Sequence, residues 1–272
     1  MRRSLSCFLL FLGFATLFLP AAVTADEAPS PRVLRVAIDD NYPPYVFRDA
    51  RGLVTGYLVD LWRLWGEKTG VRVDLLASDW AAAQQRMSDR QADAIDTIFR
   101  TPERERTLDF SPAYESIPVS IYTHSGIGGI VDLDTLRGFL VGVKAGDACV
   151  ETLAAAGITS VQAFASYEEL VGQAVDGKVR VFCLDEPPAN YLLYLYQAER
   201  EFNKAFSLYS GQFHRAVQKG DAATLALLQR GFAGISSNEE QALRRKWMGI
   251  PFVLSPHTRY LGYALLAGSL VG

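Results

Sequence analysis

Two charged residues have the chemistry to hold a small polar ligand. Arg104 lies in the charged run at 101–106, and its planar guanidinium can meet a carboxylate through two parallel hydrogen bonds. Asp185 directly follows the apolar run at 179–184, which predicts a strand, so it should lie at the carboxyl end of that strand. The alternatives are an exposed surface arginine and an aspartate that caps a helix before Pro187.

No other arrangement of reactive residues stands out. His124, His214 and His257 are scattered, so the sequence predicts no metal, and it gives no sign of a cofactor. No Ser-His-Asp arrangement can be read from the spacing. The glycine-rich stretch at 125–130 lacks phosphate-binding spacing and is interpreted as a loop. The sequence therefore favours binding over catalysis.

Alternating strands and helices must position these residues. Apolar runs predict strands at 33–38, 71–76, 92–99, 140–144 and 179–184. Leu58, Leu61, Trp62 and Trp65 follow the helical period, which predicts a helix over 57–68. Further helices are expected over 80–90 with Ser78 as cap, from about 148, and after the capping boxes at 166–169 and 237–240. This pattern indicates an α/β fold with two lobes and mainly parallel sheets, which bind ligands at the carboxyl ends of their strands.

Composition narrows the class of partner. The chain has 272 residues, of which 49% are hydrophobic and 21% charged, as in globular proteins. Lysine and arginine number 27 against 30 acidic residues, which gives a formal net charge of −3. A slightly acidic chain has no general electrostatic reason to bind nucleic acid.

Both ends differ from the middle. Residues 1–25 have the pattern of a secretory signal peptide, with Arg2 and Arg3 before an apolar run and small residues before a cut at Asp26; an N-terminal membrane anchor is the alternative. Residues 251–259 are expected to be a linker. Residues 260–272 carry no charge, and a bilayer span takes about 20 apolar residues. We interpret 260–272 as the start of a truncated transmembrane helix, with a helix packed on the domain as the alternative.

Two cysteines, Cys149 and Cys183, remain once the signal segment is removed. Export places them in an oxidising compartment, where leftover cysteines pair more often than they stay free. Cys183 lies two residues before Asp185 and hence on the same face of its strand. We predict a disulfide that stiffens the wall of the site, with two unpaired core thiols as the alternative.

Several motifs occur in the order known from one protein family. They are NYPPYVF at 41–47, GYLVDL at 56–61, ADAI at 92–95, TPER at 101–104, DFSPAY at 109–114, VGV at 141–143 with Gly146, AVQKGD at 216–221 and KWMG at 246–249. On these motifs the chain resembles the family-3 extracellular solute-binding proteins, the amino-acid-binding branch of the periplasmic Venus flytrap fold. The resemblance implies lobe 1 at 33–118 plus 212–250, lobe 2 at 119–211, and a hinge near 117–124 and 208–213. It also implies that a ligand between the lobes favours the closed form.

The resemblance assigns roles to individual residues. In the relatives, the arginine matching Arg104 clamps an α-carboxylate, and the aspartate matching Asp185 accepts hydrogen bonds from the α-amino group. Tyr42 and Trp80 match aromatic residues that sandwich the ligand side chain. An acid at the position of Asp39 meets the distal cation in relatives that bind lysine, ornithine or arginine, although it also occurs in binders of neutral amino acids.

Four further residues are expected at the cleft. Asp147 stands where relatives offer a small polar residue. Thr97 replaces one of the hydroxyls that precede the clamp arginine in relatives, in a segment that is one residue shorter here. Phe99 is expected to narrow the pocket. Lys144, together with Arg100, could reach the cleft and cancel part of its negative charge.

The charges of the site bear on the ligand. Arg104 against Asp39, Asp147 and Asp185 sums to −2. A zwitterion would leave this imbalance buried, which is costly, whereas a cationic amino acid offsets more of it. Arginine, stacked on Tyr42 or Trp80, fits best.

Three functions are compatible with the resemblance. We favour a ligand-sensing domain, periplasmic and tethered to the inner membrane through the C-terminal helix, because 93–109, 183–189 and 211–217 resemble sensors fused to cyclic-di-GMP enzymes or histidine kinases. Such a receptor could dimerise at full length. The second function is a free receptor of an ABC transporter, which usually ends near 246–249. The third is an enzyme similar to cyclohexadienyl dehydratase, for which a lone general acid at Glu186 or Glu115 is weak support.

Overall fold

The computed structural model describes residues 33–248. The predicted signal peptide at 1–25, the linker at 251–259 and the membrane segment at 260–272 lie outside the described residues. Within 33–248, no helix is both long and apolar enough to cross a membrane.

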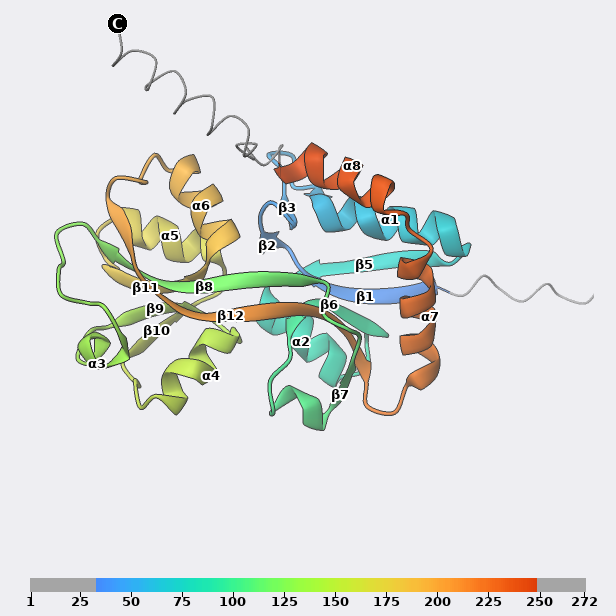
Figure 1. Ribbon diagram of the computed structural model, residues 1–272, viewed down its shortest axis with the longest axis horizontal. Coiled ribbons are helices and arrows are strands. Elements are labelled where there is room, and N and C mark those ends of the chain that lie inside the picture. Colours follow the sequence, from blue (N-terminus) through green and yellow to red (C-terminus); the bar gives the residue numbers. More distant parts are fainter. Residues whose placement is uncertain (1–32, 249–272) are drawn as a thin grey trace, which may run out of the picture. The chain divides into compact units, whose positions relative to one another are not determined.

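One part of the described chain, here called lobe 1, is built on parallel strands. β1 (Val33–Asp39) pairs with β5 (Arg72–Ser78) on one side and with β6 (Ala94–Phe99) on the other. Helices α1 (Tyr57–Thr69) and α8 (Ser237–Met248) lie on one face of this sheet and α2 (Trp80–Ser88) on the other, as Figure 1 shows. The remaining elements of lobe 1 are β2 (Asn41–Tyr42), β3 (Val46–Arg48), β4 (Val54–Thr55), the 3₁₀ helix η1 (Arg104–Arg106), β7 (Leu108–Phe110) and α7 (Ala222–Ala233).

The other part, lobe 2, repeats this architecture. β9 (Val141–Lys144) is parallel to both β10 (Val161–Phe164) and β11 (Val181–Asp185). Its helices are α3 (Leu133–Leu136), α4 (Ala148–Ala155), α5 (Tyr167–Val175) and α6 (Glu186–Leu195). In each lobe some of the parallel strands end in polar residues, Asp39 and Ser78 in lobe 1 and Lys144 and Asp185 in lobe 2, as in a ligand-binding sheet.

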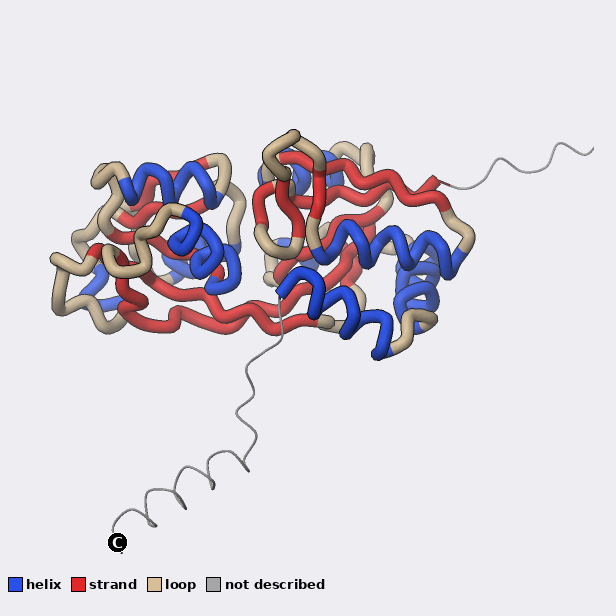
Figure 2. Tube along the Cα trace, turned by 90° about the horizontal axis from the view of Figure 1, so that it is seen from above, coloured by secondary structure: helices blue, strands red, loops and turns tan. Residues whose placement is uncertain are grey.

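Two long antiparallel strands join the lobes into one continuous sheet. β8 (Glu115–His124) pairs with β11 of lobe 2 and, along its whole length, with β12 (Phe202–Gln218), which continues onto β6 of lobe 1. Figures 1 and 2 show the two strands running side by side from one lobe to the other. The expectation of mainly parallel pairing therefore holds within each lobe but not at the junction. The predicted limits of the lobes fall within β8 and within β12. These limits stay predictions, and so does the hinge.

Helix caps account for several element starts and correct two expectations. α2 is capped by Asp79, whose carboxylate accepts a hydrogen bond from Ala82 N at 2.9 Å, and not by Ser78. α5 begins after Ser166, which caps Glu169 N as expected. Before α8, it is Ser236 rather than Ser237 that exchanges hydrogen bonds with Glu239, so that capping box lies one residue earlier.

The predicted face of α1 is buried. Leu58, Leu61, Trp62 and Trp65 are at most 4% exposed. The indole of Trp62 packs edge-on against Phe232 of α7, with ring centroids 4.9 Å apart. Gly231 allows Trp65 to approach α7 closely, because a Cβ there would lie 2.1 Å from Nε1 of Trp65.

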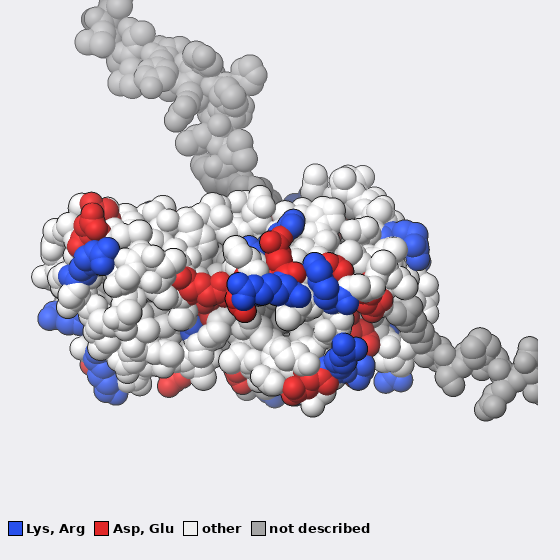
Figure 3. All heavy atoms as spheres, turned by 90° about the horizontal axis from the view of Figure 1, so that it is seen from below, with Lys and Arg blue, Asp and Glu red and all other residues white. Residues whose placement is uncertain are grey.

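The surface agrees with the charge balance of the sequence. On the face shown in Figure 3, lysine and arginine side chains are interspersed with aspartate and glutamate. Several of the exposed charges are paired with each other, as Arg106 is with Glu103 at 2.8 Å. Mixed charge of this kind does not form the basic patch that nucleic-acid binding requires.

Candidate ligand-binding site

A small cavity lies where strand ends of the two lobes meet. β1 ends at Asp39, β9 ends at Lys144, and β11 ends at Asp185. The cavity has a volume of about 20 Å³, which is room for about one water molecule. Nine of the ten residues expected at the cleft line it, and three unexpected ones join them: Asp39, Tyr42, Trp80, Thr97, Phe99, Arg104, Lys144, Asp147 and Asp185, with Ala148, Tyr167 and Phe213.

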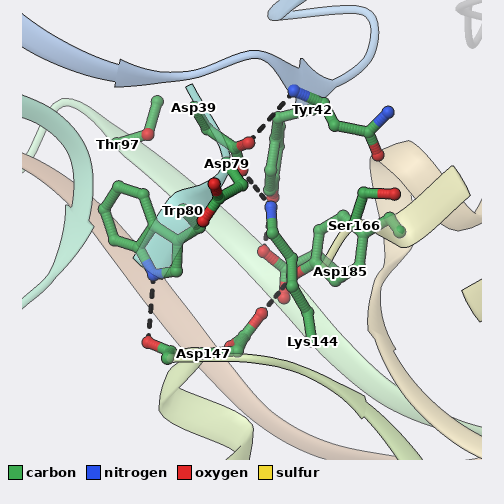
Figure 4. Close-up of polar contacts among 12 residues, drawn as sticks. Asp39, Tyr42, Asp79, Trp80, Thr97, Lys144, Asp147, Ser166 and Asp185 are labelled. Atoms are coloured by element: carbon green, nitrogen blue, oxygen red, sulfur yellow. Dashed lines mark hydrogen bonds and ion pairs between the residues drawn. The ribbon is translucent and has the colours of Figure 1, made fainter. Parts of the chain in front are cut away.

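One end of the cavity holds a buried ion pair between the lobes. The ammonium group of Lys144 donates a hydrogen bond to Oδ2 of Asp39, and the two side chains are 1% and 2% exposed. Figure 4 shows Lys144 reaching toward Asp39 beside Tyr42. The Lys144 nitrogen lies 4.3 Å from the ring centroid of Tyr167 and 5.9 Å from that of Tyr42. An acid and two aromatic faces thus form a seat for a cation.

Two further aspartates lie on the lobe 2 side. The Tyr42 hydroxyl donates to Oδ2 of Asp185 at 2.5 Å, which is a second polar contact between the lobes. Among residues 33–248, Oδ1 of Asp185 has no hydrogen-bond partner, although the atom is buried. Asp185 stands at the N-cap position of α6, as the helix-cap alternative expects, although its side chain makes no capping hydrogen bond. Asp147 instead caps α4 through Cys149 N and accepts a hydrogen bond from the hydroxyl of Tyr167.

The other end of the cavity gathers hydrogen-bond donors. Arg104 donates through Nη1 to Phe99 O and through Nη2 to Gly146 O, both at 2.9 Å. The Gly146 carbonyl also accepts from Nε1 of Trp80 and Nε2 of Gln84, each at 3.0 Å. The guanidinium carbon of Arg104 lies 5.8 Å from the Trp80 ring centroid. Donors of lobe 1 thus converge on one backbone oxygen of lobe 2.

Burial shifts the pKa values of these groups. It raises the pKa of Asp185 well above the usual carboxyl range, and the neighbouring charge of Asp147 adds to this. Burial also raises the pKa of Asp39, against the opposing effect of Lys144. The pKa of Arg104 is lowered, again because the guanidinium is buried. Uncompensated ionised groups are costly here, so the site favours ligand groups that pair with them.

Thr97 and Phe99 on β6 shape the floor of the cavity. Thr97 has a φ of 59°, in the left-handed region that β-branched residues rarely adopt, and its N–H and hydroxyl both bind Asp96. Phe99 packs on β12, where a Cβ at Gly211 would lie 2.2 Å from its ring. Phe99 lines the cavity and its backbone carbonyl accepts a hydrogen bond from Arg104, whereas the narrowing of the pocket by its ring stays a prediction.

Some expectations are not met. Arg100 does not line the cavity and instead pairs with Glu105 at the surface. Glu186 accepts a hydrogen bond from Ser120 and pairs with Lys204, and Glu115 pairs with Arg244. Neither glutamate lines the cavity, so neither is placed to act as its general acid.

Cys149 and Cys183 form a disulfide, which confirms that prediction. The bond joins the first turn of α4, next to Asp147, to β11 two residues before Asp185. It thereby fixes the two aspartates of lobe 2 to one wall.

The comparison with known proteins identifies the family of this chain. The family profile of bacterial extracellular solute-binding proteins, family 3, matches residues 34–250. The chain belongs to this family. The domain is therefore a solute-binding domain with the two-lobed fold of periplasmic binding proteins.

Individual relatives agree in fold. The L-cystine-binding protein TcyJ of Escherichia coli is 24% identical over 79% of this chain and 82% of that protein. The lysine/arginine/ornithine-binding periplasmic protein of E. coli is 25% identical over 70% of this chain and 72% of that protein. The match to a probable amino-acid ABC transporter-binding protein of Haemophilus influenzae, at 28% identity, spans 47% of this chain and about half (49%) of that protein. A histidine kinase sensor domain with similarity to periplasmic binding proteins superimposes with a TM-score of 0.75 at 24% identity, over 80% of this chain and 97% of that one.

Proposed function

We propose that this domain binds a free amino acid, with arginine preferred, between its lobes, and that it does so as the periplasmic sensing domain of a membrane receptor. The observation that carries the proposal is the pairing of opposite chemistries in one buried cavity. Arg104 stands at one end, and Asp185 with its unpartnered Oδ1 stands on the lobe 2 side. A zwitterion offers a carboxylate to the first and an ammonium group to the second.

The side-chain end of the cavity supports a cationic ligand. The seat made by Asp39, Tyr42 and Tyr167 already holds an ammonium group, that of Lys144. An arginine side chain would find there an acid for its guanidinium and two ring faces for its plane. The names of the relatives support a cationic ligand only in part, since one binds lysine, arginine and ornithine and another binds cystine.

The sensing role rests on two features besides the cavity. The solved structure reported above is a sensor domain of a histidine kinase, and the uncharged stretch at 260–272 follows the last described helix. The output module of such a receptor, whether a kinase or a cyclic-di-GMP enzyme, would follow the membrane segment. A free receptor of an ABC transporter is the second candidate, favoured by the relative from H. influenzae.

Binding is tested by thermal unfolding of the full chain against the twenty amino acids, ornithine and putrescine. A ligand at 100 times its dissociation constant stabilises the protein by about 2.7 kcal/mol, which raises the midpoint by about 5–10 °C in a domain of this size. Arginine should produce this shift, and Arg104→Ala and Asp185→Ala should abolish it. Arg106→Ala is the matched control, because Arg106 lies in the same 3₁₀ helix with its side chain 72% exposed.

A shift that survives both cavity substitutions would refute the assignment of the site. A shift with neutral amino acids alone would refute the arginine preference. Membrane fractionation of the full chain separates the two biological roles. A sensor stays with the membrane after washing in high salt, whereas release with the periplasmic fraction supports the transport receptor instead.

A further inference from the structure

One short segment of lobe 2 occupies both ends of the candidate site. Lys144 is the last residue of β9, and Gly146 follows it by two residues. Lys144 places an ammonium group on Asp39, and Gly146 places a carbonyl oxygen on Arg104. The segment thus presents a cation to the acidic end and an oxygen acceptor to the donor end, as a bound amino acid would.

The acidic end is paired with a residue of the chain itself. The Lys144 ammonium, on a side chain 1% exposed, pairs with the carboxylate of Asp39, which burial would otherwise leave costly to ionise. The rings of Tyr167 and Tyr42 lie within 6 Å of the same nitrogen. Asp39 belongs to lobe 1 and Lys144 to lobe 2, so this pair holds the lobes together.

The donor end is satisfied in the same way. Three N–H donors of lobe 1, from Trp80, Gln84 and Arg104, meet the Gly146 carbonyl at 2.9–3.0 Å. Gly146 adopts a φ of 73°, in the left-handed region that favours glycine. What remains between the two ends is a cavity of about 20 Å³, room for a water molecule and not for an amino acid.

We propose that residues 144–146 are a built-in substitute for the ligand, which holds the lobes closed when no solute is bound and which a solute must displace. The assignment of the two ends to an amino-acid site rests on the function proposed above. The closure of the lobes without solute does not depend on that function. Displacement has a measurable cost. If the self-closed form makes up 90–99% of the ligand-free protein, the apparent affinity for solute falls by about 10- to 100-fold.

Closure without ligand is tested first, by cross-linking between the lobes. Asn41 of lobe 1 and Glu168 of lobe 2 contact each other at the surface, with Glu168 N donating to Asn41 Oδ1 at 2.9 Å. In an Asn41→Cys/Glu168→Cys background, a short thiol cross-linker should join the lobes rapidly in the absence of any solute. Adding Lys144→Met should slow this reaction at least 10-fold, because the ammonium is lost while the stem is kept.

The matched control is Lys178→Met, whose lysine lies in the same lobe with its side chain 62% exposed. It should leave the rate unchanged. Trp80→Phe tests the other end, because it removes the indole donor to Gly146 O and keeps a ring; it should slow the reaction too. A parental protein that cross-links slowly without solute, or a Lys144→Met rate equal to the parental rate in folded protein, overturns the proposal.

Arginine affinity then tests displacement. Lys144→Met should bind arginine at least 10-fold more tightly than the parental chain, measured by calorimetry, since Asp39 no longer has a resident cation. Equal or weaker binding would show that Lys144 stays in place beside the ligand and would overturn the displacement step. If no variant binds any amino acid while Lys144→Met still opens the lobes, the function proposed above fails and self-closure stands.

Discussion

The disulfide between Cys149 and Cys183 should supply a large share of the stability of lobe 2. The bridge closes a loop with a sequence separation of 34 residues. Loop-closure entropy of the unfolded chain gives about 3.8 kcal/mol at 25 °C for a loop of this length. In a domain of this size that corresponds to a loss of about 8–15 °C in the unfolding midpoint on reduction.

The assay is urea unfolding of the full chain with and without a reductant. A Cys149→Ala/Cys183→Ala double variant is the control, because it should show the lower stability in both conditions and no response to the reductant. The bridge also fixes Asp147 and Asp185 to one wall, so we expect weaker solute binding after reduction. A loss of less than about 1 kcal/mol on reduction, with the bond shown to be broken, would refute the loop-closure reasoning.

Three further predictions concern other positions. Gly146→Ala should lower the free energy of unfolding by about 1–2 kcal/mol, because its φ of 73° disfavours a side chain and a Cβ would meet Nε2 of Gln84 at 2.5 Å. In urea unfolding, adding Gln84→Ala should recover part of this loss. Effects of the two substitutions that simply add would contradict the reasoning. Burial raises the pKa of Asp185, so this carboxyl lowers the free energy of unfolding as the pH rises from the ordinary carboxyl pKa to the raised folded-state pKa. Asp185→Asn should therefore raise the thermal midpoint more at pH 8 than at pH 5, and the reverse order would be evidence against a raised pKa. Gly231→Ala should destabilise lobe 1 by about 1–3 kcal/mol, because a Cβ would lie 2.1 Å from Trp65 Nε1, whereas Gly128→Ala, with no atom within 4 Å, should be neutral in the same denaturation series.

The lobes are predictable from sequence because their strands and helices carry local signals. The apolar run before Asp39 and the helical period of 57–68 both reappear as β1 and α1, with ends shifted by one residue. From sequence, α6 is expected only in the alternative in which Asp185 caps a helix before Pro187 and Pro188. They occupy the first turn of that helix, where a missing N–H costs nothing.

The junction between the lobes is harder to predict. β12 contains polar residues on both faces over much of its length, since it leaves the shelter of lobe 2 before it enters lobe 1. A strand that changes surroundings along its course shows no single period of burial. Its pairing with β8 and β6 is set by contacts distant in sequence.

The site divides in the same way. Side chains that belong to motifs, such as Arg104 and Asp185, line the cavity as expected. Tyr167 is not predicted as a site residue, because its sequence context indicates only the start of a helix. That this helix start faces the cavity is determined by the tertiary structure. The role of the Gly146 carbonyl cannot be predicted from sequence, because every residue has a carbonyl and only the fold directs this one toward Arg104.

Lys144 changes the meaning of the charge balance in the site. Counting its ammonium with Arg104 against Asp39, Asp147 and Asp185 leaves −1 instead of −2, and the raised pKa of Asp185 reduces the excess further. With Asp185 protonated the sum is zero, and a cationic solute then keeps the site neutral only if it takes the place of Lys144. A solute that displaces the segment must bind the site more favourably than Lys144 and Gly146 do. Moving such an equilibrium from 1:99 to 99:1 requires an affinity ratio of about 10⁴ between the two forms. In the self-closed form proposed above, residues 144–146 thus set the affinity for the solute as much as the contacts of the solute itself.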